Sequence, residues 1–215
     1  MMYAFSEHYI LPISHDEVVH GKKSLLDKQF GSYEDKFAGV RAFMGYMIAH
    51  PGKKLMFMGS EFGQFKEWNY KEGLEFFLKD YEKHNKLDRF FTELNRFYLV
   101  SEALYGDDDG WDGFEWIAAD DADKNSLAFI RKCGENEIIA AINFSGADIK
   151  YRIGVPKGSY KVAFDSDKQV YGGDGKSRKR IYNAEAISSN GKEYSIELDM
   201  PKLSFKYLVP VKKDN

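Results

Sequence analysis

The stretch ILPISHDEVVHGKK, residues 10–23, passes within one short segment from apolar side chains to charged ones. It begins as an apolar, β-branched run and then gathers four titratable side chains within six positions: His15, Asp16, Glu17 and His20. This order is typical of a buried strand that carries its reactive groups at its carboxyl end. In α/β folds ligands bind at that end, because the loops there vary while the sheet holds them in place.

The segments that follow predict a βαβ unit. Residues 9–14 form the first strand candidate, apolar on both faces, although Pro12 donates no ladder hydrogen bond. Ser32 has the position of an N-cap for a helix over about 33–49. Residues 55–58 are a second short apolar run, closed by a glycine. We therefore expect strand, helix and strand, with the two strands buried and parallel.

Polar side chains also follow the second predicted strand. Glu61 is one of them, and because parallel strands align their carboxyl ends, Glu61 and Asp16 are expected to share one rim of the sheet. A loop carboxylate held by backbone amides is the other interpretation of Glu61. Trp68 lies close by in sequence and fits either a sugar-stacking side chain or one that fills an apolar gap, of which we favour the second.

The sequence changes character near residue 105. Before it, residues 86–103 predict a further helix with Asn85 as its cap, and residues 106–113, GDDDGWDG, read as an acidic, solvated turn. Beyond it the hydrophobic period drops to two, and Asn190-Gly191 is a strong hairpin signal. Eight strand candidates follow: 114–118, 127–132, 137–144, 149–155, 160–165, 181–187, 193–198 and 203–209. About eight short strands in about 100 residues indicate a β-sandwich.

The predicted fold is thus α/β over residues 1–105, followed by an all-β part over residues 106–215. Two parallel strands do not make a stable sheet alone, because such sheets need more strands and helices on both faces. We expect the chain to be the C-terminal piece of something longer, or to pair with another chain. An open sheet face of this kind would be apolar, so we also expect self-association if the chain folds alone.

Composition narrows the class of protein. A net charge of −3 gives no reason to expect nucleic acid or an anionic membrane as a partner. Cys133 is the only cysteine, so an internal disulfide cannot form and a reducing, cytoplasmic setting fits best. The first residues show no signal peptide, and no apolar run approaches the ~18 residues of a membrane span.

The polar cluster of residues 15–20 could in principle form a metal site or a catalytic triad, and the sequence pattern supports neither. Glu17 and His20 have the E-x-x-H spacing that ligates iron on a helix, but the preceding strand and the intervening valines argue against a helix. The motif is not the H-E-x-x-H of zinc proteases. Ser14, His15 and Asp16 would alternate between the faces of a strand, so they would not form a triad. We expect no metal and no other cofactor.

Four segments closely resemble bacterial 1,4-α-glucan (glycogen) branching enzymes, which belong to the α-amylase superfamily: SHDEVVHGKKSLL (14–26), AHPGKKLMFMGSEFGQ (49–64), EWN (67–69) and GFEWI (113–117). The likeness runs in register over nearly the whole chain. It implies a catalytic (β/α)8 barrel followed by a C-terminal β-sandwich. Residues 1–105 would then be the seventh and eighth barrel strands with their helices, and the rest of the chain would be the sandwich.

The resemblance also implies retaining transglycosylation on an α-glucan such as glycogen or amylose. An aspartate attacks the anomeric carbon, a glutamate protonates the leaving oxygen, and a glucan 6-hydroxyl then takes the glycosyl group to create an α-1,6 branch. Asp16 and His15 match the family's His-Asp pair. Asp16 would bind sugar hydroxyls, stabilise the positive transition state and help keep the acid protonated, and His15 would donate a hydrogen bond to the same sugar.

The family's nucleophile and acid lie on earlier strands, and no segment of this chain matches either motif. We therefore expect the chain alone not to branch glucan. Two alternatives stay open. One is a glucan-binding or interaction module whose β-sandwich presents Trp111 and Trp116 as a sugar platform, although we expect both rings to be buried at the junction. The other is a fragment of an amylase-type hydrolase, against which the extended HDEVVHGKK motif argues by resemblance.

Overall fold

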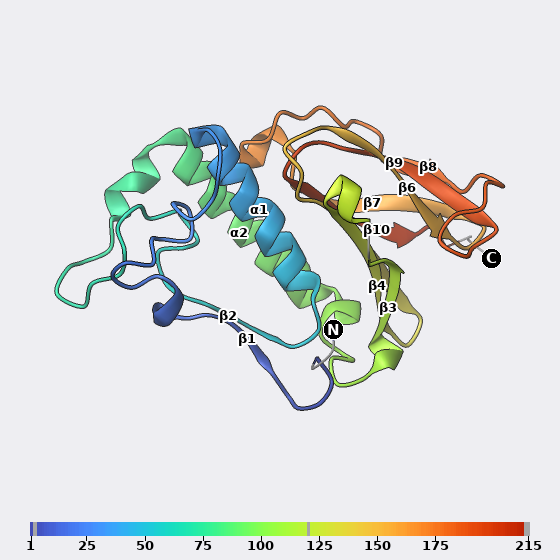
Figure 1. The fold of residues 1–215 in the computed structure, drawn as a ribbon, viewed down its shortest axis with the longest axis horizontal. Helices are drawn as coiled ribbons and strands as arrows, with labels where there is room; N and C mark the ends of the chain where they lie inside the picture. The colour runs from blue at the N-terminus through green and yellow to red at the C-terminus, as the bar shows by residue number, and fades with distance from the viewer. Residues whose placement is uncertain (2–3, 120, 213–215) are drawn as a thin grey trace.

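The structure is a computed structural model that describes residues 1, 4–119 and 121–212. Two α-helices, α1 (Tyr33–Ala49) and α2 (Glu82–Val100), run through the middle of the molecule. A small parallel sheet lies on one side of them and a β-sandwich on the other (Figure 1). Neither helix combines the length and the apolar character that crossing a bilayer requires.

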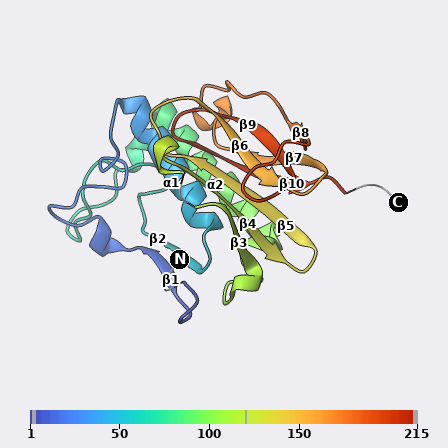
Figure 2. The ribbon, with the colours of Figure 1, turned by 45° about the vertical axis from the view of Figure 1, so that its right-hand side comes forward.

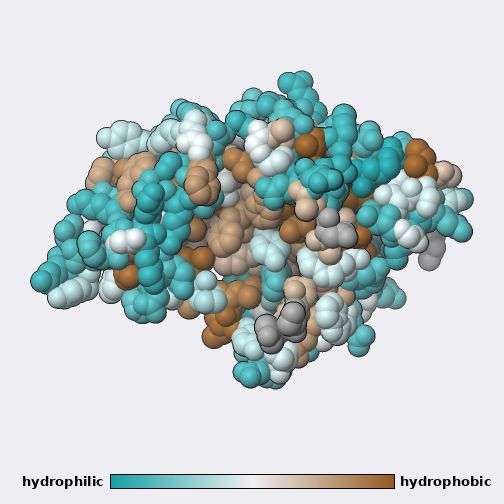
Figure 3. Space-filling view, in the orientation of Figure 1, coloured by the Kyte–Doolittle hydropathy of each residue, from teal (hydrophilic) through white to brown (hydrophobic). Residues whose placement is uncertain are grey.

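The small sheet joins β1 (Ile10–Ile13) to β2 (Lys53–Met56) in parallel, as predicted, with Ile10 opposite Lys53. The expectation that both strands are buried is wrong. Ile13 is buried, but 60% of Ile10 and 45% of Leu55 are exposed. The reason is that no third strand and no further helix covers this sheet among the described residues. Figure 3 shows the resulting apolar surface, in brown, where β1 lies in Figure 1.

Helix α1 has the predicted bounds because its ends are encoded locally. The Ser32 hydroxyl accepts a hydrogen bond from the Asp35 amide at 3.2 Å, and the Asp35 carboxylate accepts one from the Ser32 amide at 3.1 Å. This reciprocal capping box satisfies amides that a helix leaves unpaired. At the other end, His50 has left the helical conformation and donates its amide to Tyr46.

Helix α2 begins at Glu82, four residues before the prediction, so Asn85 is not its cap. The cap position is held by Tyr81, which supplies no side-chain hydrogen bond. The first turn is fixed instead by His84, which is buried and contacts the Phe62 carbonyl through Nδ1 at 2.8 Å. A polar anchor of this kind is invisible to a search for apolar periodicity, which finds its first match only at Leu87.

The remaining strands are antiparallel and form the predicted β-sandwich. Their bounds agree with the eight strand candidates to within a few residues: β3 (Phe114–Ala118), β4 (Ser126–Cys133), β5 (Asn136–Asn143), β6 (Ile149–Val155), β7 (Ser159–Asp165), β8 (Ile181–Asn183), β9 (Tyr194–Met200) and β10 (Ser204–Pro210). One sheet has the order β3-β4-β5-β10-β7-β8, and β6 pairs with β9 in the other. Figure 2 shows the two sheets facing each other.

Two apolar cores hold these layers. The inner core, with Ile139, Ile153 and Leu208 among its members, fills the space between the two sheets. The larger core lies between the helices and the other face of the six-stranded sheet, where Phe90 of α2 contacts Phe205 of β10 at a ring distance of 6.1 Å. The helices therefore cover one face of the sandwich, and the apolar packing continues across residue 105.

We expected the acidic turn before β3 to be solvated. The expectation is wrong for Asp108, which is only 6% exposed. Its Oδ1 atom accepts from Nη2 of Arg131, a fully buried residue of β4, at 2.6 Å. Arg131 also donates to the carbonyls of Gly113 at 3.0 Å and Ala49 at 2.8 Å. A buried charge needs such partners, so the acidic turn folds inward onto the arginine.

Candidate functional site

The polar cluster after β1 forms a 3-10 turn, η1 (His15–Glu17), rather than a continuation of the strand. Ser14 caps the turn: the Glu17 carboxylate accepts from the Ser14 hydroxyl at 2.7 Å and from the Ser14 amide at 2.5 Å. These bonds, led by the one from the hydroxyl, lower the pKa of Glu17. Glu17 therefore shapes the turn, while His15 and Asp16 project from it into solvent.

His15 and Asp16 touch each other. Nε2 of His15 lies 3.4 Å from Oδ1 of Asp16, because a tight turn brings adjacent side chains together where a strand would separate them. The strand geometry assumed for these residues is thus wrong. The Ser14 hydroxyl donates to Glu17, so the hydrogen-bond chain of a triad does not form here.

An aromatic group holds the His15 ring from one side. The ring meets Trp68 edge to face at 5.5 Å, and Trp68 in turn meets Phe57 at 5.4 Å. The Trp68 amide donates to the carbonyl of Val18 at 2.8 Å, which ties the segment after β2 to the segment after β1. Trp68 is partly buried by these contacts. Its contact with a sugar stays a prediction.

The second tie between these segments is Glu67, which the sequence reasoning missed as a site residue. Its carboxylate accepts from the amide of Lys23 at 2.7 Å and from that of Gly21 at 2.9 Å. These backbone hydrogen bonds lower its pKa. Glu67 is separated from its partners by more than 40 residues, so local spacing carried no signal. A cavity of about 550 Å³, lined partly by Glu67, Trp68 and Tyr70, opens beside it.

Glu61 follows β2 but has no contact with Asp16 among the interactions of the described residues. Its Oε2 atom is shielded from solvent and has no hydrogen-bond partner within the described chain, so backbone amides do not hold that oxygen. Its place on a common rim with Asp16 stays a prediction. No three His, Cys, Asp or Glu side chains converge as metal ligands in the part of the chain that the structure describes.

The two tryptophans of the proposed sugar platform behave differently. Trp116 is partly buried against Phe114 and Phe129, at ring distances of 4.9 and 5.6 Å. Trp111 is 59% exposed, which contradicts the expectation that it is buried, although its ring contacts Phe5 at 4.9 Å. Edge-to-face packing of this kind is common among aromatic side chains in protein cores.

Comparisons with known proteins show which proteins this chain is related to. Over 215 residues the chain is 46% identical to the 1,4-alpha-glucan branching enzyme of Halothermothrix orenii, an alignment that covers 98% of this chain and 34% of that protein. The chain is a homologue of the C-terminal part of bacterial branching enzymes. A second relative, the branching enzyme of Fusobacterium nucleatum, is 48% identical over 213 residues, covering 96% of this chain and 34% of that protein.

The identity to branching enzymes confirms the resemblance seen in the sequence, and a family model and two solved structures agree with the predicted fold. Residues 116–211 match the family model for the alpha amylase, C-terminal all-beta domain. An alpha-amylase from Geobacillus thermoleovorans, solved with acarbose, is similar in fold with a TM-score of 0.54 and 11% identity, over 85% of this chain and 35% of that one. An AmyP variant solved with maltotriose gives a TM-score of 0.57 and 14% identity, over 84% and 36%. The chain spans about a third of the length of the curated relatives it matches.

Proposed function

We propose that this chain is the part of a 1,4-α-glucan branching enzyme that contributes the His15–Asp16 pair to the active centre. The observation that carries the proposal is the turn η1, which holds the two side chains in contact and exposed at the carboxyl end of β1. Sequence identity above 40% to branching enzymes over nearly the whole chain supports it. The substrate is then an α-glucan such as glycogen or amylose.

In this proposal the chemistry is a double displacement. A nucleophilic aspartate from elsewhere in the complete enzyme bonds to the anomeric carbon while a glutamic acid gives its proton to the departing glucan oxygen. The 6-hydroxyl of a second glucan then attacks, loses its proton to the same glutamate and releases the nucleophile. Asp16 binds hydroxyls of the sugar being cleaved and stabilises its positive charge. His15, fixed by Trp68, donates a hydrogen bond to that sugar.

The open face of the small sheet fits a barrel that continues outside this chain. Ile10 of β1 and Leu55 of β2 are exposed there, and such large apolar side chains are normally covered in a parallel sheet. The Oε2 atom of Glu61 has no donor within the described chain, and a buried polar atom normally has one. We infer that residues 1–105 belong to the catalytic barrel and residues 106–215 to the β-sandwich, in a cytoplasmic enzyme.

The exposed apolar side chains also lead to a proposal about the chain in isolation: it self-associates through the face around Ile10 and Leu55. Sedimentation at increasing concentration would measure this. The double variant Ile10→Lys, Leu55→Lys places charges on that face and should sediment as a monomer. A wild-type chain that stays monomeric at all concentrations would contradict self-association while leaving the proposed activity untouched.

A chimera tests the proposed activity. This chain would replace the matching third of the Halothermothrix orenii branching enzyme, and the product would be incubated with amylose, debranched and analysed for chain length. We expect new short chains from the chimera and none from the isolated chain, which lacks segments that match the nucleophile and acid motifs. Asp16→Asn in the chimera should lower the branching rate by about a hundredfold to a thousandfold, because an enzyme accelerates its reaction chiefly by stabilising the charge that develops in the transition state.

Asp112→Asn is the matched control, because Asp112 is an exposed carboxylate of the turn before β3 and forms no ion pair among the described residues. It should branch amylose at the rate of the unmodified chimera. Reducing ends without new branches would favour the amylase-type hydrolase. An Asp16→Asn chimera as active as the control would overturn the role proposed for the pair.

A further inference from the structure

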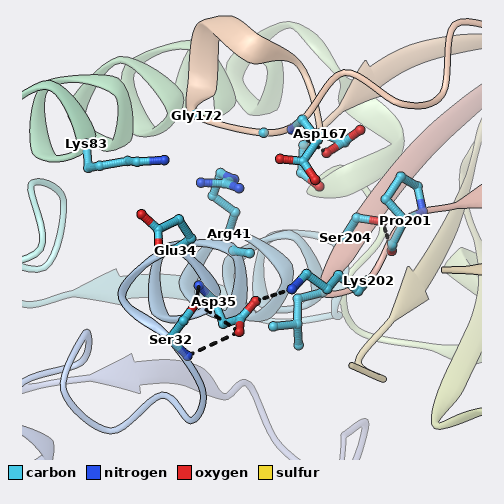
Figure 4. A pocket seen from close by; sticks show the side chains of 15 residues that line it. Ser32, Glu34, Asp35, Arg41, Lys83, Asp167, Gly172, Pro201, Lys202 and Ser204 are labelled. Carbon is cyan, nitrogen blue, oxygen red and sulfur yellow. Dashed lines mark hydrogen bonds and ion pairs between the residues drawn. The ribbon is translucent and has the colours of Figure 1, made fainter. Parts of the chain in front are cut away.

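A carboxylate that accepts hydrogen bonds from backbone amides usually shapes its own stretch of chain. Asp35 is an example, because it accepts from the amide of Ser32, three residues away, and so caps α1 (Figure 4). Glu67 is different. The two amides that its carboxylate binds belong to Gly21 and Lys23, which lie 46 and 44 residues earlier in the chain. Glu67 therefore fixes a distant loop rather than its own turn.

The backbone of that loop is strained where Glu67 binds it. Gly21 has a φ of +81°, and Lys23 has a φ of +65°. A lysine rarely adopts this left-handed conformation, because its Cβ atom then crowds a backbone carbonyl. Such strain persists where the surrounding contacts over-determine the conformation. The hydrogen bonds from the two amides to Glu67, at 2.9 and 2.7 Å, are contacts of this kind.

The loop continues directly from η1, so its position decides where the turn lies. Val18, which is buried, connects the two, and its carbonyl accepts from the amide of Trp68 at 2.8 Å. From the segment before α1, the ammonium of Lys28 donates to the carbonyl of Glu17. The end of η1 is therefore held on one side by Lys28 and on the other by Glu67 and Trp68.

Glu67 is itself supported from behind. Gln64, which is buried, donates from Nε2 to the carbonyl of Lys66 at 3.1 Å and accepts from the amide of Glu75 at 3.0 Å. The carboxylate of Glu75 in turn accepts from the amide of Lys66 at 2.9 Å. The residue before Glu67 is thus fixed at both its amide and its carbonyl. Such support lets the Glu67 carboxylate set the position of the loop that it binds.

From these contacts we infer that Glu67 is a positioning residue for the His15–Asp16 pair, which it holds in place through the loop 18–23. The side chains of His15 and Asp16 are 52% and 70% exposed, so the backbone of η1 largely decides where they point. Trp68, the neighbour of Glu67, also contacts the His15 ring. The inference rests on the proposed function, in which the pair acts on a glucan. Glu67 itself does not touch the sugar.

The chimera described above tests the inference, with branching of amylose as the measurement. Glu67→Gln keeps the shape of the side chain but replaces one acceptor oxygen by an NH2 group, which accepts no hydrogen bond from an amide. We expect the branching rate to fall by about tenfold to a hundredfold, because a misplacement of about 1 Å in an active site has effects of that size.

Glu72→Gln is the matched control. Glu72 is an exposed carboxylate of the same segment after β2, and its polar contacts, to Lys66 at 3.1 Å and Asn69 at 3.3 Å, stay within that segment. The variant should branch amylose at the rate of the unmodified chimera. Hydrogen exchange over residues 18–23 should become faster in Glu67→Gln and stay unchanged in Glu72→Gln, because only the first releases the two amides of the loop.

A double variant separates positioning from a general loss of stability. With Asp16→Asn already in place, Glu67→Gln should lower the rate by less than about threefold, because the aspartate that it positions is gone. An equal fold loss in both backgrounds would show that Glu67 acts on the fold as a whole and would overturn the inference. Unchanged hydrogen exchange over the loop would overturn it as well.

The inference and the proposed function can fail separately. If Asp16→Asn lowers the rate of the chimera while Glu67→Gln behaves like Glu72→Gln, the pair acts as proposed but Glu67 does not position it. If Asp16→Asn leaves the rate unchanged, the role of the pair is wrong and the inference about Glu67 is wrong with it.

Discussion

The guanidinium of Arg131 donates hydrogen bonds to three backbone carbonyls. One belongs to Ala49 at the end of α1, and the other two, of Leu104 and Gly113, lie in the segment between α2 and β3. Burial alone would raise the pKa of its partner Asp108, but the hydrogen bond and charge of Arg131 outweigh that effect, so the pKa lies below its ordinary value. One side chain thus fixes the junction between the helices and the sandwich.

Arg131→Met should therefore lower the free energy of unfolding by about 3–5 kcal/mol, since it leaves the buried Asp108 carboxylate without this counter-charge. Urea denaturation measures the loss. Asp108 then keeps the ion pair of its Oδ2 atom with the exposed Lys53, at 3.1 Å, but not its buried partner. Adding Asp108→Asn removes this poorly compensated buried charge and should restore part of the stability. A loss below about 1 kcal/mol for the single change would show that the pair does not hold the junction.

Lys54 is expected to make the stability of the folded chain depend on pH. Its ammonium donates to the carbonyls of His50 and Gly52, and burial lowers its pKa to about 7. The unfolded chain keeps a value of about 10.4. Between these values the unfolded state binds one proton more than the folded state, so the contribution of Lys54 to stability rises with pH from about 7 to about 10.

Urea denaturation at several pH values in this window should show that rise for the parent and a flatter curve for Lys54→Met. Lys161→Met, which removes an exposed lysine, serves as the control and should retain the parent's slope. Identical slopes for Lys54→Met and the parent would mean that Lys54 is charged in the folded state throughout.

The contacts of a single residue can be predicted from the sequence where the two partners are close together in the chain. Ser32 and Asp35 are three residues apart, so their capping box was predictable. Arg131 and Asp108, or Glu67 and Lys23, meet only after the chain has folded, and no spacing rule connects them. The His15–Asp16 pair was found because a known motif carries it, while the turn that brings the two into contact was not.

At the scale of elements, α1 lies against β10 at a glycine. A Cβ atom on Gly45 would lie 2.0 Å from the ring of Phe205, and Tyr207 donates its hydroxyl to the Gly45 carbonyl. The close approach of helix and sheet therefore depends on the absence of a side chain at this position. The predicted bounds of α1 are right because its caps are local, whereas the start of α2 was missed because a tertiary contact of His84 sets it.

Gly45→Ala should destabilise the chain by about 1–3 kcal/mol, because overpacking outweighs the gain of about 1 kcal/mol in helix propensity. Gly39→Ala is the matched control on the same helix. Its Cβ atom would meet the movable end of Gln29, at 2.7 Å from Oε1, so we expect no loss and up to about 1 kcal/mol of gain. Equal effects of the two substitutions in thermal denaturation would refute this explanation.

At the scale of the whole molecule, the helices and the sandwich share an apolar core that includes Phe90 and Phe205. Periodicity predicted each element, but not which face of the sheet the helices cover, because that depends on contacts between segments far apart in sequence. The open apolar face of β1 and β2 was expected from the incomplete sheet, whereas the expected burial of both strands was wrong.

The shared core predicts one cooperative unfolding transition for the chain, with calorimetric and van't Hoff enthalpies in a ratio of about 1. Arg131→Met at the junction and Ile153→Val inside the sandwich should both move that single transition to lower temperature. Two separate transitions, each responding to only one of the variants, would show instead that the sandwich folds independently of the helices.

The glycine of α1 that admits Phe205 also has a consequence for how this chain can change during evolution. A domain with a closed core of its own can be transferred by recombination into an unrelated protein and still fold. Here the six-stranded sheet has one face completed by two helices of its neighbour, so a gene break at residue 105 would separate complementary surfaces. The all-β part is therefore expected to be inherited together with the helices that precede it, and substitutions on either side of the break should be correlated during descent.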